Sequence, residues 1–318
     1  MRLHHPLVGA TAALAALTLS ACGSPGPGAP GASPAADDGV VTVVASTNVY
    51  GAIAEAVGGE DVTVESIITD PAADPHSYES TPADAAIVSD ADVVIRNGGG
   101  YDAFMPQLLE ATDGSPAVID VAELSGLVPA EEAGEEHAHG ELNEHLWYSL
   151  PTVQQVATRL AAELGTVDPA GAATYTANAQ AFAGEVASLQ ERVEAIGPSV
   201  EAGRVAVTEP IPAYLIETAG LTDVTPPEFS EAVEEDTDPP AAVVAETLAL
   251  FAPGAEPIEA LILNSQTQTP TTEQVRQAAR AGGVPVVEMS ETLPDGAAGY
   301  LAWMGSQVDA LSAALNPV

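Results

Sequence analysis

Short β-branched segments alternate with helical segments along this chain from Val40 onward, and this alternation constrains the fold more than any other feature. Hydrophobic runs rich in Val and Ile indicate strands that are buried on both faces. Strands separated by helices pair in parallel, because each helical crossover returns the chain to the end where the previous strand began. The predicted strands form two series, at 40–44, 62–68, 92–95 and 117–119 and then at 204–207, 260–263 and 284–287.

Between the two series lies a stretch with helical signals and no strand signal. One helical face carries apolar residues three or four positions apart, at Val153, Val156, Leu160 and Leu164. Gly165 predicts an interruption, and a second helix is predicted from Pro169 to Ile196, about 42 Å long at 1.5 Å per residue. We therefore predict an α/β fold with two lobes, each a mainly parallel sheet flanked by helices, joined by a long backbone helix.

The N-terminal segment predicts secretion and lipid attachment. Arg2 precedes an apolar run from Leu7 to Leu19 that is too short to span a bilayer. The segment Leu19-Ser20-Ala21-Cys22 resembles a bacterial lipobox, and its cysteine is the only one in the chain. We predict a lipoprotein signal peptide over residues 1–21 and lipidation of Cys22. The alternative is a buried cysteine that follows an ordinary signal peptide.

The composition of the next segment predicts a spacer. Residues 23–36 are all Gly, Ser, Pro or Ala, which cannot bury enough apolar surface to fold. Residues 22–39 are thus predicted to be a lipidated cysteine with a flexible tether, which holds the protein on the cell membrane, facing outside the cytoplasm. The predicted folded parts are an N-terminal α/β lobe at 40–150, linking helices at 151–200 and a C-terminal α/β lobe at 201–318.

The charge balance excludes one large class of functions. The chain has 46 acidic residues against seven basic ones, all arginine, and a formal net charge of −39. Nucleic-acid binding through a basic face needs clustered Lys and Arg to neutralise phosphates, so it is excluded. An acidic surface attracts cations instead.

Two histidines and two glutamates lie next to predicted strands or helices, in loops that could form a ligand-binding site. His76 follows a predicted strand of the first series, and His145 precedes the linking helices. Glu209 and Glu291 each follow a predicted strand of the second series, and open α/β sheets bind ligands at these strand ends. Two imidazoles and two carboxylates carry a charge of −2 that matches a divalent cation. Nitrogen and oxygen donors together suit Zn²⁺ or Mn²⁺.

Three motifs carry a resemblance to a known family. They are Asp74-Pro75-His76-Ser77-Tyr78-Glu79, Asn97-Gly98-Gly99-Gly100-Tyr101-Asp102 and Asn143-Glu144-His145-Leu146-Trp147-Tyr148. Over residues 41–315 the sequence resembles the metal-binding solute-binding proteins of ABC importers, in the zinc and manganese cluster that has a long backbone helix.

The resemblance implies a ligand set. His76 and His145 match the two first-lobe ligands of the family. Glu209 takes the third position, where zinc members usually have histidine and manganese members often have glutamate. Glu291 takes the fourth position, where aspartate is more usual, and Asp295 is the alternative fourth ligand.

The choice between the two metals depends on opposing signals. The additional carboxylate at the third position makes the site harder and favours Mn²⁺. The acidic segment 131–140 resembles a shortened form of the His- and acid-rich loop that many zinc members carry. His137 and His139 in this segment are predicted to form an accessory metal loop, with a solvated acidic loop as the alternative. We expect zinc as the bound metal and manganese as the alternative.

The predicted function is extracytoplasmic capture of a divalent transition metal between two lobes and its delivery to an ABC permease with its ATPase. We expect a monomer that is not an enzyme, that binds the membrane through its N-terminal lipid and that binds no nucleic acid. The alternatives are a metal-dependent surface hydrolase, a binder of organic solutes and an adhesin. The hydrolase is disfavoured for two reasons. A catalytic zinc usually keeps an open coordination position, whereas four protein ligands would close the shell here, and the chain lacks an H-E-x-x-H motif.

Overall fold

The computed structural model describes residues 40–112, 114–128 and 142–316. The compact unit from Val40 onward contains two four-stranded sheets. The predictions for the signal peptide, Cys22, the tether, His137 and His139 lie outside the described residues.

The first sheet has the strand order β2-β1-β3-β4, and every neighbouring pair is parallel. Its strands are β1 (Val41–Thr47), β2 (Val62–Ile68), β3 (Val93–Arg96) and β4 (Ala117–Asp120). The helices of this lobe are α1 (Asn48–Gly58), α2 (Pro82–Ser89), α3 (Phe104–Ala111) and α4 (Val121–Ser125), with a 3-10 turn η1 (Gly59–Asp61). All four predicted strands of the first series are present, because each is a hydrophobic run bounded by turn residues.

The second sheet has the order β6-β5-β7-β8, again with parallel pairs, so both sheets arrange their strands in the same way. Its strands are β5 (Arg204–Val207), β6 (Thr222–Asp223), β7 (Ala260–Asn264) and β8 (Val286–Met289). Its helices are α7 (Ala213–Thr218), α8 (Pro227–Glu234), α9 (Ala241–Ala249), α10 (Pro270–Ala281) and α11 (Tyr300–Leu315). The sequence did not predict β6, because both of its residues are exposed and polar. Strand β8 begins two residues later than predicted.

The two series are connected by η2 (Leu146–Tyr148), α5 (Leu150–Val167), α6 (Ala172–Glu194) and η3 (Gly197–Ser199). The predicted interruption at Gly165 is wrong, since α5 continues to Val167. A Cβ atom at Gly165 would lie 3.0 Å from the Cβ of Ala172, so this glycine lets the start of α6 approach α5 closely. The long helix predicted over 169–196 is α6.

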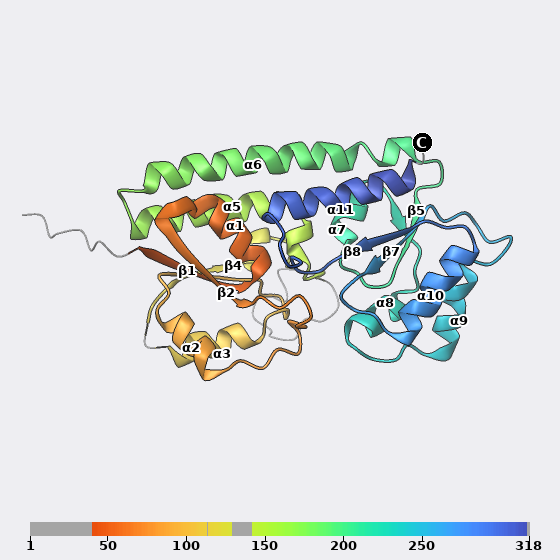
Figure 1. The fold of residues 1–318 in the computed structure, drawn as a ribbon, viewed down its shortest axis with the longest axis horizontal. Coiled ribbons are helices and arrows are strands. Elements are labelled where there is room, and N and C mark those ends of the chain that lie inside the picture. Colours follow the sequence, from red (N-terminus) through yellow and green to blue (C-terminus); the bar gives the residue numbers. More distant parts are fainter. Residues whose placement is uncertain (1–39, 113, 129–141, 317–318) are drawn as a thin grey trace, which may run out of the picture. The chain divides into compact units, whose positions relative to one another are not determined.

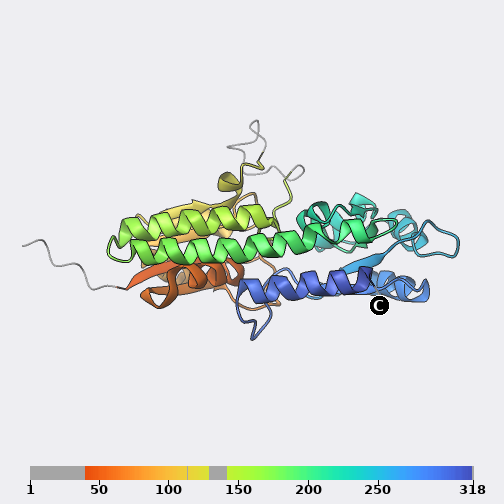
Figure 2. The same ribbon diagram turned by 90° about the horizontal axis from the view of Figure 1, so that it is seen from above.

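One hydrophobic core includes residues of both lobes. It extends from Val41 in β1 through Leu160 in α5 and Val186 in α6 to Val205 in β5 and Met304 in α11. Helix α6 contacts α1 and α5 in the first lobe and α7 and α11 in the second, and Figure 2 shows it running along both. Separating or rotating the lobes would expose this apolar surface to water, at a free-energy cost of about 25 cal/mol per Å².

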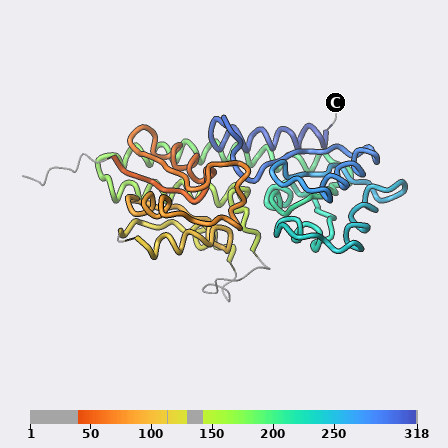
Figure 3. Tube along the Cα trace, turned by 60° about the horizontal axis from the view of Figure 1, so that its bottom comes forward, coloured from red at the N-terminus to blue at the C-terminus, as the bar shows by residue number. Residues whose placement is uncertain are grey.

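Each sheet also has a second apolar layer on its other face. Helices α2 and α3 cover the first sheet there, and α8, α9 and α10 cover the second (Figure 1). In Figure 3 the red-to-yellow segments of the first lobe lie to one side and the cyan and light-blue segments of the second lobe to the other. The predicted fold, with two α/β lobes joined by a long helix, is therefore confirmed.

A tight turn after β3 places an aromatic side chain toward the second lobe. Gly98 has a φ of 70°, and a Cβ atom there would lie 2.4 Å from Oδ1 of Asp120, so only glycine fits. The buried carboxylate of Asp102 accepts hydrogen bonds from the backbone N–H of Asn97 at 2.6 Å and of Gly98 at 2.9 Å. The same turn buries Tyr101 completely.

We expect Asp102→Asn to destabilise the protein by about 1 to 3 kcal/mol, because the amide group cannot accept both backbone hydrogen bonds. The free energy of unfolding from urea titration of the metal-free protein measures this loss. The exposed Asp90, changed to Asn in a matched control, should alter stability by less than about 0.5 kcal/mol. Equal stabilities of the two variants would contradict the role given to Asp102.

Candidate metal centre

Three of the four predicted ligands follow strands, and the fourth precedes a 3-10 turn. His76 follows β2, His145 directly precedes η2, Glu209 follows β5 and Glu291 follows β8. A cavity of about 290 Å³ is lined by His76, Glu209 and Glu291 together with Glu234 of α8. Both lobes therefore contribute walls to one polar cavity.

His145 is held as a neutral ligand. Its side chain is 1% exposed, and its Nδ1 lies 3.0 Å from Oδ1 of Asn143, which also accepts the His145 backbone N–H. Because a carboxamide oxygen only accepts hydrogen bonds, Nδ1 carries the proton and Nε2 keeps a free lone pair. Burial, with a smaller effect of His76, lowers the pKa of His145 well below its usual value. Neutral imidazole is the form that binds metals.

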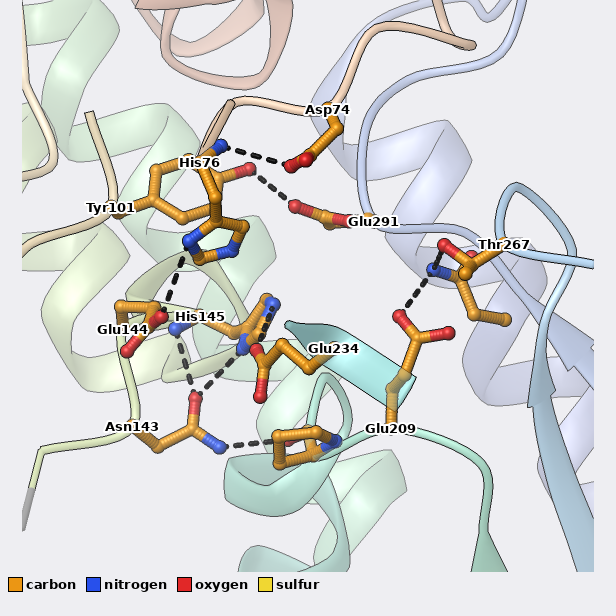
Figure 4. Close-up of polar contacts among 12 residues, drawn as sticks. Asp74, His76, Tyr101, Asn143, Glu144, His145, Glu209, Glu234, Thr267 and Glu291 are labelled. Carbon is orange, nitrogen blue, oxygen red and sulfur yellow. Dashed lines mark hydrogen bonds and ion pairs between the residues drawn. The ribbon is translucent and has the colours of Figure 1, made fainter. Parts of the chain in front are cut away.

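His76 lies nearer the solvent, with 27% of its side chain exposed. Its Nδ1 is 3.6 Å from Oε1 of Glu144, and its ring makes an edge contact with Tyr101 at 5.0 Å between centroids. The backbone N–H of His76 bonds Oδ1 of Asp74 at 2.9 Å, which fixes the loop that carries it. Figure 4 shows both imidazoles facing the carboxylates of the second lobe.

The two predicted carboxylates line the cavity but are each held by a neighbour. Oε2 of Glu209 accepts a hydrogen bond from Asn264 at 2.8 Å, whereas its buried Oε1 has no partner among the described residues. Oε1 of Glu291 accepts a hydrogen bond from Tyr101 of the first lobe at 2.7 Å. Burial raises the pKa of Glu209 to about 8 and that of Glu291 to about 7.

The sequence did not point to a third carboxylate, that of Glu234, which ends α8. Possible ligand atoms of His76, His145 and Glu234 all lie within 4.8 Å of one another. Sequence reasoning missed Glu234 because the segment that follows it is acidic and typical of a solvated surface. The four-residue spacing of Phe229 and Val233 predicts a helix with one apolar face here, but that spacing does not indicate that Glu234 reaches the site.

Asp295, the alternative fourth ligand, lies outside the cavity lining. Asp295 is exposed, in a turn that is closed by a backbone hydrogen bond from Ala297 to Pro294, and it is not among the residues that line the cavity.

The cavity collects several carboxyl groups. Burial, with smaller contributions from the neighbouring carboxylates of Glu144, Glu209 and Glu291, raises the pKa of Glu234 to about 9. No Lys or Arg is among the described residues that line the cavity. Buried carboxylates next to imidazoles are a suitable donor set for a divalent cation.

Comparison with known proteins identifies the family. The model of the family "Zinc-uptake complex component A periplasmic" matches residues 43–314. The chain belongs to this family. Among its relatives, the manganese-binding lipoprotein MntA of Halalkalibacterium halodurans is 28% identical over 221 residues, which cover 65% of this chain and 71% of that protein. The iron-binding protein YfeA of Yersinia pestis is 30% identical over 186 residues, 57% of this chain and 58% of that protein.

Solved structures of similar proteins have the same fold. The periplasmic zinc-binding protein TroA of Treponema pallidum has a TM-score of 0.70 at 20% identity, with 87% of this chain and 99% of that chain covered. The solute-binding protein FpvC of Pseudomonas aeruginosa in complex with Mn²⁺ has a TM-score of 0.68 at 24% identity, with 86% and 98% covered. At these identities the likeness establishes the fold alone.

The predicted family, the metal-binding solute-binding proteins of ABC importers, is confirmed. The named relatives bind different metals, so their names support a divalent metal without selecting one. In the part of the chain that the structure describes, no helix is both long and apolar enough to cross a membrane.

The raised pKa values predict how the stability of the metal-free protein depends on pH. Glu209, Glu234 and Glu291 keep protons in the folded state up to about pH 8, 9 and 7, whereas the unfolded chain loses them in the usual range of glutamate. The folded state therefore binds more protons in this window, and linkage requires stability to fall as pH rises. We expect the Tm of metal-free protein to decrease steadily from about pH 5.5 to about pH 8.5.

Glu209→Gln should make the decrease of Tm with rising pH smaller, because it removes one of the three titrating groups. The exposed Glu246, changed to Gln, serves as the control and should leave the slope unchanged. A Tm that rises across the window, or equal slopes in the two variants, would contradict the assignment of buried protonated carboxylates.

Proposed function

We propose that this protein captures a divalent transition metal in the cavity between its two lobes and delivers it to an ABC permease with its ATPase. The observation that carries the proposal is the buried His145, whose free Nε2 lies 3.4 Å from Oε1 of Glu234, beside a cavity with no Lys or Arg among the described residues that line it. Such a cavity is costly when empty and is stabilised by a divalent cation. The bound metal is the transported substrate.

We propose His76, His145, Glu209 and Glu291 as the ligands of this metal. The two imidazoles come from the first lobe and the two carboxylates from the second, so the metal would bind both lobes at once. The hydrogen bonds from Asn264 to Glu209 and from Tyr101 to Glu291 would orient the carboxylates, as partners of metal ligands commonly do.

Zinc is the proposed metal and manganese the alternative. Two nitrogen and two oxygen donors can form the tetrahedral shell that Zn²⁺ prefers. Mn²⁺ prefers oxygen donors and higher coordination numbers, so the carboxylate of Glu209 favours Mn²⁺. The names of the relatives include zinc, manganese and iron, which supports this class of ions.

Attachment to the membrane through a lipid on Cys22 completes the proposal. A monomer tethered outside the cytoplasm would exchange its metal with the permease close to the membrane surface. The name of the relative MntA includes the word lipoprotein, which supports such an anchor. His137 and His139 are proposed as an accessory metal-binding loop.

The decisive experiment is calorimetric titration of Zn²⁺ and Mn²⁺ into metal-free protein. We expect one high-affinity ion per chain, and His145→Ala should weaken binding more than about 100-fold, since loss of an outer partner alone costs about 10- to 100-fold. Gln268→Ala, an exposed position on the cavity rim, is the control and should bind as the wild type does. Absence of binding by the wild type would contradict the proposed function.

A change of donor type at the third ligand should change the preferred metal. Glu209→His keeps the number of donors and replaces an oxygen with a nitrogen, which makes the site softer. We expect the ratio of Zn²⁺ to Mn²⁺ affinity to increase by about tenfold or more, measured by competition between the two ions. An unchanged ratio, or one that moves toward Mn²⁺, would show that Glu209 does not contact the metal.

A further inference from the structure

We propose that Glu234 is a third carboxylate ligand of the transported metal and that it sets the balance between Mn²⁺ and Zn²⁺. This inference rests on the proposed function and adds to it a residue that the family resemblance did not supply. Glu234 belongs to α8, an element that carries none of the four ligands proposed above (Figure 4).

The distance between Glu234 and His145 fits a shared ion. Oε1 of Glu234 lies 3.4 Å from Nε2 of His145. Two ligand atoms that are each about 2.1 Å from one ion and separated by a tetrahedral angle lie about 3.4 Å apart. A direct hydrogen bond would be shorter, about 2.7 to 3.2 Å. The observed spacing is therefore that of two donors to a common cation.

The alternative, an ordinary ion pair between the two side chains, does not fit their chemistry. The Nδ1 atom of His145 holds the ring proton against Asn143, so Nε2 presents a lone pair to Glu234. Oε1 of Glu234 is buried and has no hydrogen-bond partner among the described residues. Two acceptors that face each other in a buried place need a proton or a metal ion between them, and a metal ion suits the 3.4 Å spacing.

The backbone around Glu234 holds it in this position. Phe229 and Val233 anchor α8 in the apolar layer of the second lobe. The helix ends through hydrogen bonds from the N–H of Asp236 to Val233 and from the N–H of Thr237 to Ala232. Asp236 has a φ of 52° and is the one non-glycine residue with a positive φ in the described ranges. Such an αL residue is the usual end of a helix, so the position of Glu234 is defined by the fold.

A third carboxylate changes which ions the site accommodates. With Glu234 the cavity offers two nitrogen and three oxygen donors, one more than a tetrahedral zinc shell uses. Additional oxygen donors and a higher coordination number suit Mn²⁺. Glu234 should thus contribute more to the affinity for Mn²⁺ than to that for Zn²⁺.

The test compares Glu234→Gln with Glu235→Gln, which removes the same charge from the exposed next residue. We expect Glu234→Gln to lower Mn²⁺ affinity about tenfold or more and Zn²⁺ affinity by less, as measured by competitive calorimetric titration of the metal-free proteins. Glu235→Gln should retain both affinities. The visible spectrum of bound Co²⁺ provides a second readout: it should change toward a four-coordinate ion only in Glu234→Gln.

The outcomes separate the two proposals. If wild type binds neither metal, the proposed function fails. If wild type binds metal but Glu234→Gln matches Glu235→Gln in both affinities and in the Co²⁺ spectrum, the role of Glu234 is wrong and the proposed function stands. An equal loss for both metals would overturn the specificity role. If Glu234→Gln does not melt cooperatively, Glu234→Asp, which keeps the charge and shortens the reach, should show the same selective loss of Mn²⁺ affinity.

Discussion

The apolar core that α5, α6 and α11 share with both sheets is the constraint on which the rest of the structure depends. Because α6 contacts helices of each lobe, the strand ends of the two sheets are held at one spacing. Two hydrogen bonds between the side chain of Asn48 and the backbone of Leu293 reinforce this spacing next to Glu291. Large rotation of the lobes would expose part of the core, so the fold favours small movements around the cavity.

The rigid frame makes an otherwise unfavourable cavity possible. Glu209, Glu234 and Glu291 line one cavity, although like charges repel and burial disfavours their ionised forms. The free energy of the apolar core supports this arrangement in the metal-free state. A divalent cation would remove the conflict, so binding would also stabilise the fold. Protons hold the carboxylates neutral until then.

Membership in the family does not determine which metal this protein binds. Relatives with similar folds are named for zinc, manganese and iron, so the fold alone does not select the ion. Selection must come from the number and type of donor atoms around the ion. Two of the side chains that offer donor atoms at this site, Glu209 after β5 and Glu234 at the end of α8, are glutamates.

The sequence by itself determined the two series of strands, the long helix and the family, because hydrophobic periodicity and the motifs around His76 and His145 are local signals. It also indicated Glu209 and Glu291, since each follows a recognisable buried strand. It missed β6, whose exposed residues lack a hydrophobic pattern, and it misplaced an interruption at Gly165, where packing against α6 tolerates glycine within a helix. Only the tertiary structure brought Glu234 to His145. That contact joins residues 89 positions apart on separate lobes, and such a distance depends on how the lobes pack against the shared helices.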